Sequence, residues 1–248
     1  MSGHSKWATT KRRKSAVDAK RGKIFTKLTK EITVAARFGG GDQDANPRLR
    51  HAIAAAKSSN MPNENIERAI KRGTGELEGV QYEEISLEAY GPGGVALIIE
   101  TLTDNRNRTL ADVRHILSRS GGNLGERGCV SWMFEKKGLI VVDEDSSDED
   151  EIFMIALESG ADDLKTENDT FDIYTDPEIF EDVRNAIEEA SINITLAEIS
   201  MIPQTTVSVD GKNAQQVLQL LETLDEHDDI QHVYSNFDIP DEMLDAAA

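Results

Sequence analysis

Apolar residues recur at helical spacing in the first part of the chain. Four of them follow one another at intervals of four, four and three residues: Ile24, Leu28, Ile32 and Ala35. This spacing predicts a helix over 15–38 that ends at the glycines 39–41. A second helix is predicted to begin at Asn46 and Pro47, which suit an N-cap and a first helical position, and a third runs to Gly73. These segments predict a small N-terminal bundle of three helices.

After residue 80 the period changes to two, which is typical of strands that bury one face. Ile85, Leu87 and Ala89 alternate with polar residues, and Gly-Pro-Gly-Gly at 91–94 predicts a hairpin turn. Neither Gly-Lys-Ser/Thr nor a helix follows these glycines, so they do not form a phosphate-binding loop. Further strands are predicted at 95–101, 130–135, 139–142 (after a turn at 136–138), 163–166, 170–174, 194–202, 205–209 and 230–235, and further helices at 108–119, 148–158, from 176 onward and 213–225.

The order of these elements, ββα, then ββαββαβ, then βαβ, predicts an α+β fold class with antiparallel sheets. Two ferredoxin-like units account for it if the first ββα and the final βαβ pair into one unit and the middle block is inserted in that unit. We therefore expect three domains. They are a basic helical domain at 1–78, an α+β domain formed by 79–130 together with 204–240, and an inserted acidic α+β domain at 131–203.

The charge of the chain is divided unevenly. The 248 residues carry 46 acidic and 27 basic side chains, and a net charge of -19 would by itself argue against a nucleic-acid partner. However, residues 1–75 hold 17 Lys and Arg against 6 Asp and Glu, whereas residues 76–248 hold 10 against 40. A net +11 beside a net -30 indicates that a polyanion would bind the N-terminal segment.

Composition also excludes some classes of protein. No apolar run reaches the roughly 18 to 20 residues that a membrane-spanning helix needs, and the basic start lacks the apolar segment of a secretory signal. The single cysteine, Cys129, can form no intrachain disulfide and lies in a strand pattern, so we interpret it as a core residue. We expect a cytoplasmic protein without a membrane partner.

The strongest candidate site is the basic N-terminal arm and helix, because ten cations lie in the first 30 residues. On the helix, the cations fall opposite the apolar face, and Trp7 in the arm could stack on a base. The predicted nucleic-acid-binding residues are Lys6, Trp7, Lys11, Arg12, Arg13, Lys14, Lys20, Arg21, Lys23, Lys27, Lys30 and Arg37. The alternative is an ordinary solvated helix face preceded by a tail.

A second contact is predicted where a strand gives way to a helix at 104–109. Arginines beside a helix N-terminus suit phosphate, which takes backbone N–H groups and guanidinium groups together. The candidate residues are Asn105, Arg106, Asn107 and Arg108. The alternative is that these arginines pair with neighbouring carboxylates and that an asparagine caps the helix.

Catalytic and metal-binding signals are weak. Seven acids lie in the nine positions 143–151, but Asp148 stands where a calcium loop requires glycine, so a solvated turn and first helical turn are expected. His227 and His232 lie among the acids of 225–229 and indicate a surface turn. No nucleophile and base can be paired from the spacing, so we predict no catalytic residue, no metal and no cofactor.

Six motifs taken together closely resemble the YebC/PmpR family, in order and over the chain to about residue 240. They are Gly-His-Ser-Lys-Trp at 3–7, Gly-Lys-Ile-Phe-Thr-Lys at 22–27, Asp-Ala-Asn-Pro-Arg-Leu-Arg at 44–50, Tyr-Gly-Pro-Gly-Gly at 90–94, Asp-Asn-Arg-Asn-Arg-Thr at 104–109 and Gly-Gly-Asn-Leu-Gly at 121–125. The resemblance implies a helical domain followed by two α+β domains, one interrupted by the other. It also implies that the nucleic-acid side includes Lys6, Lys11, Arg12, Arg13, Lys23 and Lys27.

The function implied by this resemblance is a cytoplasmic, nonenzymatic regulator of gene expression that binds DNA. The same resemblance supports an alternative, a translation factor that acts on ribosomal RNA and relieves stalling at the ribosome. Two weaker alternatives are a metal-dependent hydrolase that uses the acidic clusters and an acidic protein-interaction scaffold. Apart from nucleic acid, the expected partners include a protein at the acidic surface but no small-molecule substrate.

Overall fold

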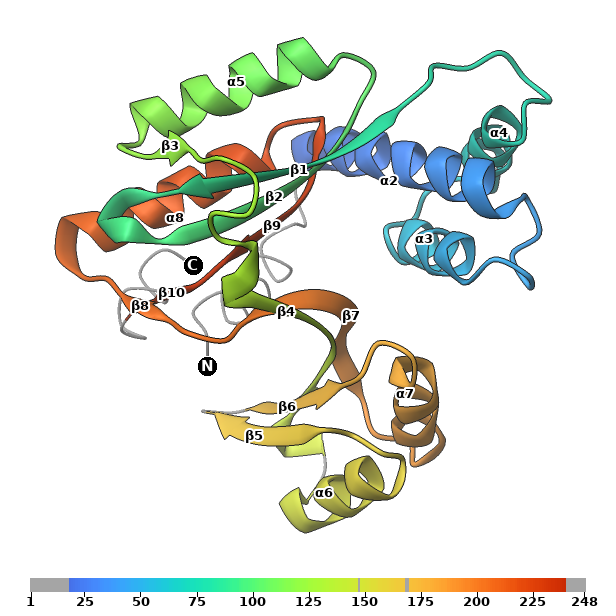
Figure 1. The fold of residues 1–248 in the computed structure, drawn as a ribbon. Helices are drawn as coiled ribbons and strands as arrows, with labels where there is room; N and C mark the ends of the chain where they lie inside the picture. Colours follow the sequence, from blue (N-terminus) through green and yellow to red (C-terminus); the bar gives the residue numbers. More distant parts are fainter. Residues whose placement is uncertain (1–17, 147, 168–169, 240–248) are drawn as a thin grey trace.

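The N-terminal part of the molecule is a bundle of three helices. The structure is a computed structural model that describes residues 18–239 apart from 147, 168 and 169 (Figure 1). Its first helices are α2 (Asp18–Gly39), α3 (Pro47–Ser58) and α4 (Asn63–Gly73). Their apolar faces meet in one core, in which Ile32, Leu49 and Ala69 are fully buried. The predicted bundle is confirmed.

Asn46 joins α2 to α3. Its side-chain oxygen accepts a hydrogen bond from the backbone N–H of Leu49 at 3.1 Å, which is the N-cap contact. Its amide nitrogen donates to the carbonyl oxygens of Ala35 and Gly40 at 2.8 and 2.9 Å. One buried side chain therefore fixes the turn between the two helices.

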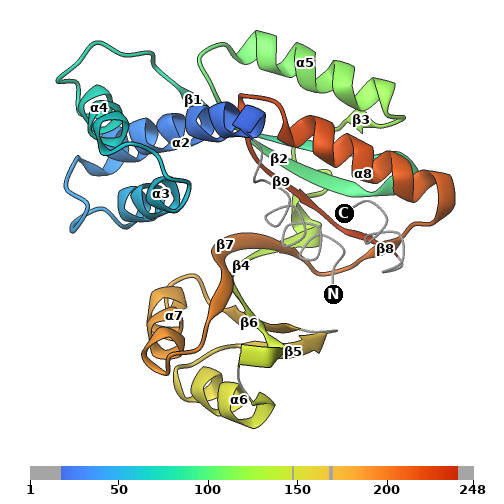
Figure 2. The same ribbon diagram turned by 180° about the vertical axis from the view of Figure 1, so that it is seen from behind.

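The first α+β unit is a four-stranded antiparallel sheet in the order β3-β1-β2-β9. Its strands are β1 (Glu83–Tyr90), β2 (Ala96–Thr103), β3 (Asn123–Leu124) and β9 (Ile230–Ser235). The helices α5 (Arg106–Arg119) and α8 (Gly211–Asp225) cover one face of this sheet (Figures 1 and 2). β9 lies near the end of the described chain and pairs with β2. The first ββα and the final helix and strand therefore form one unit.

The second sheet has the order β5-β6-β4-β7, and all its neighbouring strands are antiparallel. Its strands are β4 (Phe134–Asp143), β5 (Asp163–Glu167), β6 (Thr170–Thr175) and β7 (Ile194–Pro203), and its helices are α6 (Glu149–Glu158) and α7 (Phe180–Glu189). This β-α-β-β-α-β sequence with β4 and β6 at the centre is a ferredoxin-like unit. It is inserted between β3 and α8, which confirms the predicted α+β fold class.

The predicted turn at 136–138 is wrong. β4 continues through it, and Gly138 pairs with Thr175 on one side and Ile199 on the other. A side chain at Gly138 would overlap Thr175 Oγ1 and the ring of Phe180. The glycine therefore marks a close approach in a central strand rather than a turn. Before it, the segment predicted as the start of a strand forms a 3-10 turn at Ser131–Met133.

The predicted strand at 205–209 is present only as β8 (Val207–Ser208), and it does not join the sheet of the first unit. It pairs in parallel with β10 (Phe237–Asp238), which the periodicity does not predict. Within the described residues, the first unit therefore lacks the fourth long strand of a ferredoxin-like unit, and the two-residue β3 lies at that sheet's edge.

The two α+β units share a small core. Ala96, Ile98 and Tyr234 on the first sheet pack with Val130 and Phe134, which lie at the start of the inserted unit. The inserted unit is thus anchored on the face of the first sheet that α5 and α8 leave uncovered.

Candidate nucleic-acid interface

The predicted site residues divide into three groups. The first group lies outside the described part of the chain: Lys6, Trp7, Lys11, Arg12, Arg13 and Lys14. Lys20 and Arg21 belong to α2, but only their backbone is described. The remaining candidates lie on the body of α2, at the N-cap of α5 and in the first turn of α5.

The lysines of α2 lie against the loop between α8 and β9 (Figure 2). Lys23 Nζ is 3.6 Å from a carboxylate oxygen of Glu226. Lys27 Nζ donates to the carbonyl oxygen of Asp225 at 2.6 Å and is 3.4 Å from a carboxylate oxygen of the same residue. The N-terminal bundle and the first α+β unit are therefore joined by ion pairs between α2 and this loop.

Lys30 is the most deeply placed of these lysines. Its Nζ donates to Asp229 Oδ1 at 2.6 Å and to the carbonyl oxygen of Asp228 at 2.9 Å. The ammonium group also lies 5.6 Å from the centre of the Tyr82 ring, within the range of a cation–π contact. Lys30 is thus a structural cation between two parts of the molecule.

Asp229 is the centre of this contact. Besides Lys30, its carboxylate accepts hydrogen bonds from Arg108 at 2.8 Å, from the Thr109 hydroxyl at 2.7 Å and from the Thr103 hydroxyl at 3.2 Å. Burial would raise the pKa of Asp229, but the hydrogen bonds from Arg108, Lys30 and Thr109 outweigh it and hold the pKa well below its usual range. The carboxylate is therefore ionised in the folded protein.

The expectation that the cations of α2 face solvent is wrong for two of them. Side-chain exposure falls along the helix from 47% at Lys23 to 16% at Lys27 and 9% at Lys30. Interpreting 225–229 as a surface turn is likewise wrong for Asp229, which is 3% exposed. The signal for this contact was present in the sequence as a row of lysines on one helix and a short loop with four acids.

Partners are also present for Arg37 on α2 and for the N-cap and first turn of α5. Arg37 donates to the carbonyl oxygen of Val80 at 3.2 Å. Asn105 caps α5, since its side-chain oxygen accepts from the backbone N–H of Arg108 at 3.2 Å. Arg106 is 2.9 Å from Glu83.

Arg108 lies between two carboxylates, Asp104 at 2.7 Å and Asp229 at 2.8 Å. Asn107 is exposed. Local pairing and helix capping, the alternative to a phosphate site, therefore describe the observed contacts of Asn105, Arg106 and Arg108.

Sequence reasoning did not select the exposed cations of α3 and α4. Arg50 and Lys57 are seven residues apart and so lie on one side of α3, and Lys71 and Arg72 are in the last turn of α4. By contrast, Arg48 is held between the carboxylates of Glu31 and Glu84. The bundle thus carries a second set of exposed cations, on α3 and at the end of α4.

Metal binding and thiol reactivity can be assessed for the described residues. Among them no three His, Cys, Asp or Glu side chains come together so that they could hold a metal ion. Burial, with the nearby Glu88 adding to it, raises the pKa of the Cys129 thiol and keeps it protonated near neutral pH. Within the same described ranges, no helix is long and apolar enough to cross a bilayer.

Comparison with known proteins assigns the chain to a family. Residues 5–76 match the TACO1/YebC N-terminal domain, and residues 82–237 match the TACO1/YebC second and third domain. Two relatives are each named probable transcriptional regulatory protein. The one from Desulforapulum autotrophicum is 62% identical to this chain, over 99% of this chain and all of the relative. The one from Syntrophobacter fumaroxidans is 61% identical, over the whole of both chains. The crystal structure of a conserved hypothetical protein from Aquifex aeolicus is 50% identical, covers 93% of this chain and 96% of its own, and superimposes with a TM-score of 0.83. The chain therefore belongs to the YebC family.

Proposed function

We propose that this protein is a nonenzymatic regulator of gene expression that binds duplex DNA through its basic N-terminal domain. The observation that carries the proposal is the concentration of 17 Lys and Arg in the first 75 residues of a chain whose net charge is -19. The name of the relatives, probable transcriptional regulatory protein, supports the regulatory role.

The contacts of α2 suggest a division of roles among its cations. Lys30 and Arg108 both neutralise Asp229, and the Lys30 contact holds the bundle against the first α+β unit, so we leave both cations out of the proposed interface. Lys23 is half exposed and pairs with an equally exposed Glu226, and such a pair is weak in water. We propose that Lys23 binds DNA phosphate together with Lys20, Arg21 and the cations before residue 18.

The test is a titration of labelled duplex DNA with the full chain at several salt concentrations. If about six phosphates are neutralised, log K should fall with log salt at a slope of about -5. Reversing the charge of Lys11, Arg12 and Arg13 to Glu should abolish most of the binding. A matched variant reverses three exposed cations elsewhere, at Arg127, Lys136 and Lys212. Equal binding by the two variants would overturn the proposed interface.

A second candidate is binding to ribosomal RNA. The observation that favours it is the scarcity of base-reading side chains on α4, where Arg68 is paired with Glu64 at 2.8 Å and the other candidates are Asn63, Asn65 and Arg72. A surface with few base-reading side chains is better suited to contacts with the backbone of a structured RNA than to the recognition of a base sequence. Cosedimentation with ribosomes, compared with a gel shift on duplex DNA at the same salt, separates the candidates by which target retains the protein.

A further inference from the structure

The helix α6 of the inserted unit exposes an apolar face. Phe153, Met154 and Leu157 are 48%, 52% and 58% exposed. Phe153 and Leu157 are four residues apart and Met154 is three residues before Leu157, so the three side chains are neighbours on the helix surface. The opposite side of α6, with Ile152 and Ala156, is buried in the core of its own unit. The exposed residues are therefore not needed for that core.

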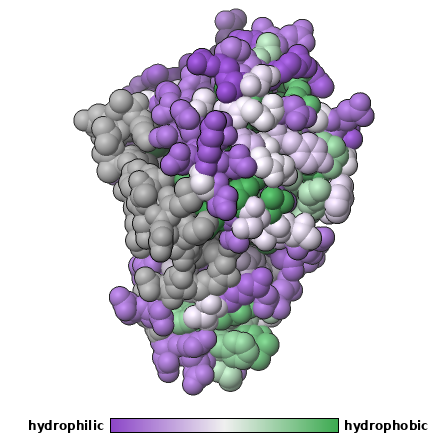
Figure 3. Space-filling model, turned by 90° about the vertical axis from the view of Figure 1, so that its left-hand side faces the viewer, coloured by the Kyte–Doolittle hydropathy of each residue, from purple (hydrophilic) through white to green (hydrophobic). Residues whose placement is uncertain are grey.

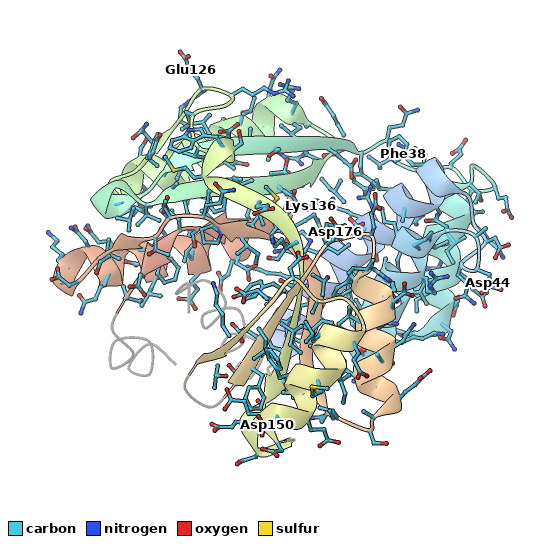
Figure 4. All side chains as sticks on the ribbon, turned by 60° about the horizontal axis from the view of Figure 1, so that its bottom comes forward. Phe38, Asp44, Glu126, Lys136, Asp150 and Asp176 are labelled. Atoms are coloured by element: carbon cyan, nitrogen blue, oxygen red, sulfur yellow. The ribbon has the colours of Figure 1, made fainter. Side chains whose placement is uncertain are left out.

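The apolar face is bordered by acids. Glu149, Asp150 and Glu151 form the first turn of α6, and Glu158 ends it; all four are exposed. Figure 3 shows green side chains next to purple ones at the lower end of the molecule, where α6 lies in Figure 1, and Figure 4 shows Asp150 at the outer side of that helix. The segment 131–203 carries 21 acids and 4 cations, which accounts for most of the net charge of the chain.

An apolar centre with a charged rim is the usual composition of a protein-binding surface. The flexible thioether of Met154 adapts such a surface to the shape of a partner. The acidic rim selects among partners, because it repels the phosphates of nucleic acid and of anionic lipid. It also disfavours a second copy of α6, since pairing two such faces would bring two acidic rims together.

We propose that the exposed face of α6 binds a basic amphipathic helix of a partner protein. Apolar side chains of that helix would cover Phe153, Met154 and Leu157, and its Lys or Arg residues would pair with the acids of the rim. This surface is separate from the cations of the N-terminal bundle, so the proposal does not depend on nucleic-acid binding.

The probe is a fluorescein-labelled 18-residue peptide of Leu and Lys arranged to form one apolar helix face. Its anisotropy is followed as the full chain is added. The double variant Phe153→Ser, Leu157→Ser should bind at least tenfold more weakly. A control variant, Leu77→Ser with Val80→Ser, removes equally exposed apolar side chains elsewhere and should bind within twofold of the wild type. Thermal melting followed by circular dichroism checks that both variants are folded.

Three results would overturn the proposal. They are no binding by the wild type, equal loss in the two variants, and equal binding of a scrambled peptide that has the same charge but no apolar face. Light scattering after gel filtration adds a fourth: a wild-type dimer that the Phe153→Ser, Leu157→Ser variant dissociates would assign the face to a second copy. Neutralising Asp150 and Glu158 to Asn and Gln should weaken binding severalfold and reduce its salt dependence.

Discussion

Asp229 contacts three parts of the chain that are distant in sequence. Lys30 comes from α2, Thr103 from the end of β2, and Arg108 and Thr109 from the first turn of α5. Two ions that are almost fully removed from water stabilise each other only while both are present, because either one alone would retain the cost of its lost hydration. The carboxylate therefore determines whether Lys30 can stay where it is.

Replacing Asp229 with Asn should strongly destabilise the protein. The change keeps the size of the side chain and leaves Lys30 buried without a carboxylate, so we expect the free energy of unfolding to fall by about 3 to 5 kcal/mol. Urea denaturation at pH 7 measures it. The control is Asp228→Asn at the exposed neighbour, with a change of at most about 0.5 kcal/mol. Similar values for the two variants would mean that the contact is unimportant for stability.

Glu88 gives a prediction that depends on pH. Its carboxylate accepts backbone N–H bonds from Gly128, Val130 and Ser131 at 2.6, 2.7 and 2.8 Å. Burial would raise the pKa of Glu88, but these hydrogen bonds lower it overall. Folding thus lowers the pKa, and the stabilising contribution is complete above the pKa of the unfolded chain, about 4.3, and is lost as pH falls through the folded value.

The variant Glu88→Gln should therefore lower the free energy of unfolding by about 1.5 to 3 kcal/mol at pH 7. The difference from the wild type should be constant down to about pH 5 and should shrink below about pH 4. Urea titrations at a series of pH values measure both. Glu126→Gln in the exposed loop after β3 is the control (Figure 4). A difference that grows as pH falls would contradict the assignment.

At the scale of the elements, α2 and α4 approach closely at Gly73. A Cβ at Gly73 would overlap the carbonyl oxygen of Thr33 and would lie 2.7 Å from Ala36 Cβ. Gly73→Ala should thus cost about 1 to 3 kcal/mol of stability through overpacking. Gly22→Ala is the matched control, because nothing lies within 4 Å of its Cβ and alanine should stabilise α2 by about 0.5 to 1 kcal/mol. Thermal melting measures both: the melting temperature should fall for Gly73→Ala and rise for Gly22→Ala.

The periodicity of the sequence predicts most elements, because the amphipathic pattern is a local property. β9 has the predicted bounds, α2 ends one residue after its predicted end, and α8 begins two residues before its predicted start; the predicted start of the first helix lies outside the described residues. The wrong prediction of a turn at 136–138 could not have been corrected from the pattern, because the reason for a glycine at Gly138 is its contact with Phe180, 42 positions later. The burial of Asp229 could not be predicted for the same reason. The lysines and the acids are visible in the sequence, but the hydrogen-bond donors that bury this carboxylate come from residues 30 to 109.

At the scale of the whole molecule, the acids of the loop 225–229 pair with lysines of α2 and so compete with a polyanion for them. The pair between Lys23 and Glu226 is half exposed, so a DNA phosphate could replace the carboxylate. Removing that carboxylate should strengthen DNA binding through the loss of a competitor. A surface pair of about 0.2 to 1 kcal/mol corresponds to at most about a fivefold gain in affinity.

The variant Glu226→Gln should accordingly bind labelled duplex DNA about two- to fivefold more tightly at low salt, with the gain disappearing as salt is raised. Fluorescence anisotropy measures it. Glu222→Gln, one helical turn earlier and also exposed, has the same change in net charge and is the control. An equal gain in both variants would indicate a general charge effect and would exclude Lys23 as the cause.

The insertion of one unit into another also sets an order of events during synthesis. The inserted unit is contiguous and can fold as soon as it leaves the ribosome, whereas the sheet of the first unit pairs β2 with a strand that is translated more than 120 residues later. Until then the free edge of β2 is uncovered, and Lys27 and Lys30 have no loop to contact. The nascent chain therefore presents a more strongly basic surface than the finished protein does.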